Sequence, residues 1–125
     1  MKSTLLSRRD LDFLLFEWLH VDELTKRERF AEHSEETFAG VLDLCEQLAT
    51  RYFAPHNKKS DANEPRFDGE KVTVIGEVKE ALDAFAKADL MGMVMSQGLG
   101  GAQLPAAVAE AAFAWFSAGC SWAGV

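Results

Sequence analysis

Basic residues are scarce in this chain relative to acidic ones. The 125 residues include 13 lysines and arginines against 20 aspartates and glutamates, which gives a formal net charge of −7. Binding to nucleic acid or to an anionic membrane needs a basic face. The charge deficit therefore argues against both of these classes of partner.

Cysteine and histidine are also few. Cys45 and Cys120 lie far apart in apolar, helix-like segments, so they form neither a metal-binding pair nor a disulfide framework. Buried, reduced thiols are expected, which suits a cytoplasmic protein. Each of the three histidines stands alone, and residues 33–37 (HSEET) lack the second histidine of the H-E-x-x-H zinc motif. The residues by themselves predict no catalytic set and no metal site.

Long apolar runs are missing as well. Residues 111–125 are apolar but short, and rich in Ala, Gly and Ser, so we expect no membrane span. Residues 7–11 (SRRDL) begin like a twin-arginine export signal, but Asp12 and Glu17 interrupt the uncharged region that such a signal needs. A soluble protein whose first helix is capped by Ser7, with Asp10 three residues on, is the favoured interpretation.

The chain does have ample material for a core. Apolar residues make up 48% of it, with nine Phe and three Trp. Helical periodicity dominates, and the first helix has a stripe at Leu11, Leu14, Leu15, Trp18 and Leu19. Further helices are predicted at residues 34–53, capped by Ser34 and stopped by Pro55; at 76–89, with Val78, Leu82, Phe85 and Ala86 facing inward; and from Pro105 onward.

The segments between these helices are polar. Residues 20–33 form a charged connector, and residues 56–70 are rich in turn-forming residues. Residues 72–75 have strand character but are too short, with no visible partner, to make a sheet. The prediction is an all-α, bundle-like domain of four or five helices.

A glycine cluster in residues 91–105 (MGMVMSQGLGGAQLP) raises the question of a phosphate-binding loop. Gly98 and Gly100 match the first two positions of the dinucleotide fingerprint G-x-G-x-x-G, but Gln103 occupies the third. No lysine follows to complete a P-loop. A turn that uses positive φ at glycine is the favoured interpretation.

The order of several motifs resembles the N-terminal helical domain of acyl-CoA dehydrogenases. Residues 99–105 (LGGAQLP) and the alanine-rich helix that ends in residues 118–125 (AGCSWAGV) resemble the family's turn and fourth helix. Residues 77–92 are similar to the step just upstream. Residues 8–17 (RRDLDFLLFE) and 52–65 resemble the branch that includes 3-methylmercaptopropionyl-CoA dehydrogenase. The resemblance divides the chain into an extension helix with its connector at 1–33 and the helical domain at 34–125.

The resemblance implies a flavoenzyme. Enzymes of this family oxidise acyl-CoA thioesters to 2,3-enoyl products: FAD takes the hydride, a glutamate takes the proton, and an electron-transfer flavoprotein is the acceptor. The FAD site and the catalytic glutamate lie in the family's middle β-domain and C-terminal domain, which this chain is expected to lack. The chain is thus expected to be an N-terminal lobe, part of a homo-oligomer, with no catalytic or cofactor-binding residue and no FAD of its own.

Two residues are the nearest candidates for the wall of the acyl and flavin cavity. They are Trp122 and Val125, and ordinary helix packing is the competing interpretation for both. A different function is also open: a self-standing helical oligomerisation or interaction module without enzyme activity, suggested by the apolar excess of the first and last helices.

Overall fold

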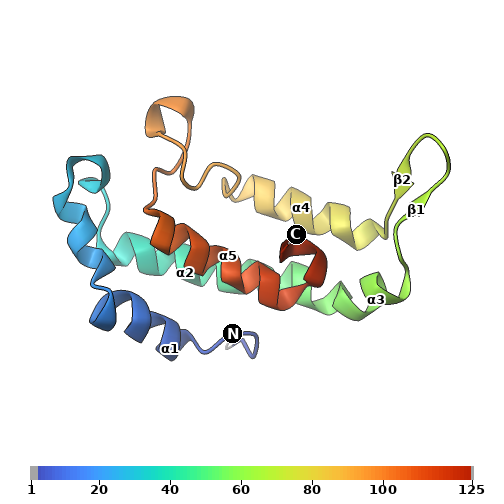
Figure 1. Cartoon of the computed structure of the whole chain (residues 1–125), viewed down its shortest axis with the longest axis horizontal. Helices are drawn as coiled ribbons and strands as arrows, with labels where there is room; N and C mark the ends of the chain where they lie inside the picture. The colour runs from blue at the N-terminus through green and yellow to red at the C-terminus, as the bar shows by residue number, and fades with distance from the viewer. Residues whose placement is uncertain (1–2, 125) are drawn as a thin grey trace.

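The computed structural model describes residues 3–124, and within them the chain is mostly helical (Figure 1). The α-helices are α1 (Arg8–Asp12), α2 (Glu35–Leu48), α3 (Asn57–Ala62), α4 (Gly76–Lys87) and α5 (Ala106–Gly119). The long helices α2, α4 and α5 run along the length of the molecule, and α1 lies beneath α2 in the view of Figure 1. The predicted all-α class is confirmed.

The core lies where α2 and α5 pack against each other. Phe38, Leu42 and Cys45 are fully buried on one face of α2, at the i, i+4, i+7 spacing of a helical stripe. On α5, the buried alanines Ala109 and Ala112 let neighbouring helices approach closely, and Trp115 and Phe116 are buried beside them. These two helices form the frame on which the remaining segments pack.

The start and end of α2 follow the prediction for residues 34–53. The Ser34 hydroxyl accepts a hydrogen bond from the Thr37 backbone N–H, and the Thr37 hydroxyl accepts one from the Ser34 N–H, which makes a capping box. Beyond Leu48 the helix continues as a π-helical stretch, Ala49–Phe53. A 3-10 turn at Ala54–His56, containing Pro55, then ends it.

The N-terminal segment confirms one prediction and corrects another. The Ser7 hydroxyl accepts from the Asp10 backbone N–H, as expected of the N-cap. The predicted apolar stripe is wrong, because the helix becomes π-helical over Phe13–Trp18 and the wider turn breaks the 3.6-residue period. Leu15 is buried, whereas Trp18 is 67% exposed.

The connector at residues 20–33 folds into two short 3-10 turns, Val21–Lys26 and Glu28–Phe30. Val21 of this segment is buried in the core, and the partly buried Leu24 packs against it. His20, immediately before it, adopts a left-handed conformation (φ 51°) that turns the chain out of the first helix.

Regular elements form in and just after residues 56–70, the segment predicted to be turns. Helix α3 forms within it, and the strands β1 (Arg66–Phe67) and β2 (Val72–Thr73) pair antiparallel. The expectation that residues 72–75 lack a partner is therefore wrong. Gly69 allows the tight reversal (φ 102°), and the hairpin projects beyond α3 and α4 at one end of the molecule (Figure 1).

Helix α4 packs on a narrower face than predicted. Ala81 is its buried residue, whereas Leu82 and Ala86, both predicted inward, are exposed. The small Ala81 side chain allows close approach to the core, and the larger Leu82 faces an open groove instead.

Candidate functional site

An apolar groove runs between α4 and α5. It consists of two adjoining cavities of about 320 and 330 Å³ that share Phe85, Met91 and Phe113. The remaining residues that line this α4–α5 groove are Phe53, Leu82, Phe116, Trp122 and Ala123 at one end, and Leu90, Met93, Val94, Ala109 and Glu110 at the other. Glu110 is the one charged side chain among them, so the groove suits an apolar ligand or surface.

Aromatic side chains form the floor of the groove. Phe116 meets Phe85 edge-on, with ring centroids 5.0 Å apart, and Phe53 in the same manner at 4.8 Å. Met91 lies at the rim and is 73% exposed. The groove thus has a rigid aromatic floor and, at its rim, the flexible side chain of Met91.

Trp122 closes one end of the groove. Its ring stacks on Phe53, with centroids 5.2 Å apart, and its indole N–H donates to Nε2 of His56 at 2.9 Å. The sequence pointed to Trp122 as a cavity wall, and the residue does line this groove. Whether the groove accepts an acyl chain stays a prediction. Val125, the other predicted wall residue, lies outside the described residues.

The structure brings Cys120 beside the same histidine. Its sulfur lies 3.6 Å from Nε2 of His56, and both side chains are buried. Burial raises the pKa of the Cys120 thiol, and the nearby backbone N–H groups of Trp122 and Ser121 offset only part of this effect. The pair therefore holds a neutral thiol and does not form an activated nucleophile.

Cys45 lies in the core, as expected for a thiol in an apolar, helix-like segment. Burial raises the pKa of its thiol to about 12. It is a packing residue rather than a reactive one.

A polar pocket of about 260 Å³ also has His56 in its wall. Its other lining residues are Arg51, Tyr52, Pro55, Lys59, Glu77 and Glu80. Lys59 donates to Glu77, and this hydrogen bond lowers the pKa of the Glu77 carboxyl. His56 thus borders both the polar pocket and, through Trp122, the apolar groove.

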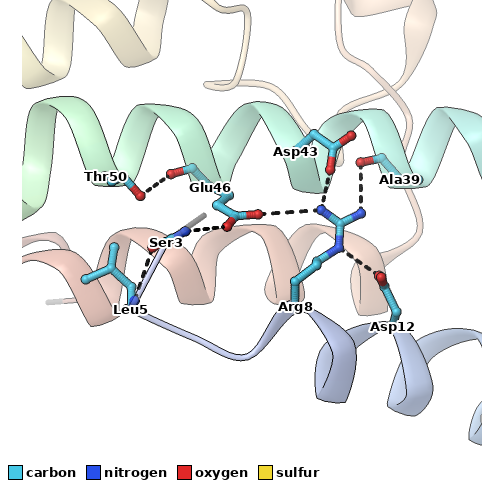
Figure 2. A network of polar contacts seen from close by, with 8 residues as sticks. All are labelled: Ser3, Leu5, Arg8, Asp12, Ala39, Asp43, Glu46 and Thr50. Atoms are coloured by element: carbon cyan, nitrogen blue, oxygen red, sulfur yellow. Dashed lines mark hydrogen bonds and ion pairs between the residues drawn. The ribbon is translucent and has the colours of Figure 1, made fainter. Parts of the chain in front are cut away.

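Arg8 ties the N-terminal segment to α2 (Figure 2). Its guanidinium meets the carboxylates of Asp12 at 2.8 Å, Asp43, and Glu46 at 3.7 Å, and it donates to the carbonyl of Ala39. Burial alone lowers the pKa of Arg8, but hydrogen bonds to Asp12 and Asp43 outweigh this and leave the pKa above its ordinary value.

Glu46 extends this network to the start of the described chain. It accepts from the Ser3 backbone N–H at 3.2 Å, while the Ser3 hydroxyl accepts from the Leu5 N–H (Figure 2). The Arg8 guanidinium bonds to oxygens of the protein itself. This network, the Arg8 clamp, therefore holds the N-terminal segment against α2.

The glycine cluster is a turn, as the sequence favoured. The backbone N–H groups of Leu99, Gly100 and Gly101 donate to carbonyl groups of Ser96 and Gln97, so they are not free to hold a phosphate. Gly100 has φ 84°. Hydrogen bonds between its own backbone groups therefore close this turn.

Gln103, which breaks the nucleotide fingerprint, has a role of its own. It adopts a left-handed conformation (φ 53°), its side-chain oxygen accepts from the Gln97 N–H, and its amide donates to the Arg29 carbonyl. His33 Nε2 lies 3.0 Å from the Gln103 carbonyl oxygen. No local pattern in the sequence indicates these links, which bind the glycine turn to the connector.

Comparison with protein-family models finds no match for this chain, and comparison with curated proteins finds none either. Among the described residues, no helix has both the length and the apolar character needed to cross a membrane. The site must therefore be interpreted from its own chemistry.

Proposed function

We propose that this chain is the N-terminal helical lobe of an FAD-dependent acyl-CoA dehydrogenase, where it walls one side of the acyl and flavin cavity. The observation that carries the proposal is the α4–α5 groove, an open apolar channel next to the motifs that resemble the family. The resemblance of residues 99–105 and 118–125 supports the same assignment.

The chemistry of the groove suits an acyl chain. Each methylene that leaves water for a surface of Phe and Met side chains contributes about 0.8 kcal/mol. Leu82 and Met91 are exposed at the rim of the groove, so an acyl chain can reach the aromatic floor without displacing core residues.

Among the described residues, those of the groove and the glycine turn do not fit the diphosphate of FAD. The groove contributes a carboxylate, Glu110, rather than cations, and the N–H groups at the glycine turn are used within the turn. Under the proposal, hydride and proton transfer belong to the family's middle and C-terminal domains, and this lobe supplies apolar surface.

The test compares octanoyl-CoA with free CoA at millimolar concentration, by methyl NMR of the 125-residue chain. We expect the Met91 and Leu82 methyl signals to shift with octanoyl-CoA and not with CoA, while the Leu44 signal on α2 stays unchanged. The Met91→Gln variant should weaken the effect, whereas Met95→Gln, outside the groove lining, should not. Equal shifts with CoA, or no shifts, would contradict an acyl site.

A second measurement tests the assignment of chemistry to other domains. The purified chain should carry no FAD and should not oxidise octanoyl-CoA. A yellow, flavin-loaded preparation would overturn the proposal that this part is a lobe only.

One observation favours the second candidate function, an oligomerisation or interaction module. Phe13, Trp18 and Leu19 are at least half exposed on the N-terminal segment, and clustered apolar side chains of this kind mark interaction surfaces. Sedimentation across micromolar to millimolar concentrations should then detect a dimer that Trp18→Ser weakens. A strict monomer at the highest concentration would count against this candidate.

A further inference from the structure

The hydrogen bond between Trp122 and His56 fixes the state of the histidine. An indole N–H can only donate, so Nε2 of His56 must accept, at 2.9 Å. A nitrogen that accepts carries no proton. The docked arrangement therefore requires a neutral His56 with its proton on Nδ1.

His33 has the opposite requirement. Its Nε2 lies 3.0 Å from the carbonyl oxygen of Gln103, which can only accept, so His33 donates. Neutral and protonated forms of His33 can both make this bond. The two histidines thus differ in their response to acid, and His33 provides a matched control within the same chain.

Protonation of His56 places two hydrogen-bond donors, its own Nε2–H and the Trp122 indole N–H, opposite each other. With a proton on Nε2, the imidazolium has no lone pair for the Trp122 indole, and the bond is lost. We propose that His56 is a proton-operated latch: the neutral ring holds Trp122 in the wall of the α4–α5 groove, and the protonated ring releases the C-terminal turn, Ser121–Gly124.

The charges around His56 are close to balanced. The titratable and charged groups that face it are Arg51 and Tyr52 from the π-helical stretch, Lys59 from α3, Glu77 and Glu80 from α4, and Cys120 at the end of α5. Two cations therefore oppose two carboxylates. The buried thiol of Cys120 stays neutral, so it adds no charge beside His56.

Few other polar contacts hold the turn. Ser121 N–H donates to the Asn57 side chain at 3.2 Å, and Ala123 N–H donates to the Cys120 carbonyl at 3.1 Å. The Trp122 ring otherwise stacks on Phe53, and it also lies nearly parallel to the His56 ring, with centroids 5.7 Å apart. Loss of the indole bond therefore removes the main polar tie between Trp122 and the helical frame, and opens the end of the groove.

The experiment follows the indole N–H signals of the full chain by NMR between pH 8 and pH 5. We expect the Trp122 signal to shift and to lose about tenfold in protection from solvent exchange as the pH falls. The signals of Trp18 and Trp115 should change little. Trp122→Phe identifies the signal.

Two substitutions separate the latch from a general effect of acid. His56→Gln keeps an acceptor that does not titrate, so the Trp122 signal should become independent of pH, while His33→Gln should leave its pH profile unchanged. In Trp122→Phe, which cannot donate, the Ser121 and Ala123 amide signals should also become independent of pH. A flat wild-type profile, or the wild-type profile in His56→Gln, would overturn the proposal. No acyl ligand is used, so the result does not depend on the proposed function.

Discussion

The carbonyl oxygen of Met95 occupies the space that a side chain at Gly101 would need. A Cβ placed on Gly101 would lie 2.1 Å from that oxygen and 2.5 Å from the Met95 Cβ. The glycine turn is therefore closed by contact between two backbone segments, and a glycine is required at this position for steric reasons.

Gly101→Ala should destabilise the chain by roughly 2–4 kcal/mol, because backbone must move to admit the methyl group. Gly98→Ala is the matched control, since a Cβ there meets no atom within 4 Å. Its unfolding free energy should change by no more than about 0.5 kcal/mol. Urea unfolding followed by circular dichroism measures both, and equal effects would disprove the steric explanation.

Removal of the Arg8 clamp should loosen the N-terminal segment. Arg8→Met leaves the Asp12, Asp43 and Glu46 carboxylates without their shared cation, and we expect a loss of roughly 1–2 kcal/mol in unfolding free energy. Arg9→Met, at an exposed neighbour, should have little effect. The difference should shrink at high salt. If salt did not change the difference in unfolding free energy, the loss would come from the packing of the Arg8 side chain and not from its charge.

The hairpin should respond to acid through Asp68. Its carboxylate accepts from the backbone N–H groups of Lys71 and Glu70, both at 2.9 Å, and these bonds lower its pKa. A lowered pKa means that the stabilisation is present above the ordinary carboxyl pKa and is lost as the pH falls through the lower, folded value. The Glu70 and Lys71 amide shifts should follow this titration by NMR, and Asp68→Asn should abolish it. Titration at the ordinary value would contradict the bonds.

Cys45 should resist alkylation. Since its pKa is raised to about 12 by burial, almost no thiolate forms at pH 8. Iodoacetamide labelling, followed by mass spectrometry, should be at least about a hundredfold slower than in concentrated urea. Rapid labelling without denaturant would mean that α2 opens readily from α5.

Local signals in the sequence predicted some elements well and others poorly. The Ser34 cap and the stop at Pro55 placed α2 and its π-helical continuation correctly, because each signal lies beside the helix end that it marks. The predicted apolar stripe through Leu14 and Trp18 is wrong, since a π-helical turn changes the helical period and no residue pattern indicates such a turn. Helix α3 was missed because the surrounding turn residues dominate the composition there.

The candidate site depended on contacts that no local pattern encodes. His56 and Trp122 are 66 residues apart, and they meet only after the chain passes through α3, the hairpin, α4 and α5. Trp122 was singled out through a resemblance, but its partner was not. Leu82 was assigned inward from periodicity, which cannot distinguish a core from an open groove.

The π-helical stretch Ala49–Phe53, which continues α2, determines in which direction around the helix axis the residues after it point. Each residue of an α-helix advances the chain by about 100°, and a π turn holds one residue more than the α register needs. A chain shortened by one residue here, at Thr50, would gain a regular helix and turn His56 by about that angle, away from Trp122. One surplus residue in a helix thus decides which side chains, far along the sequence, can meet at all.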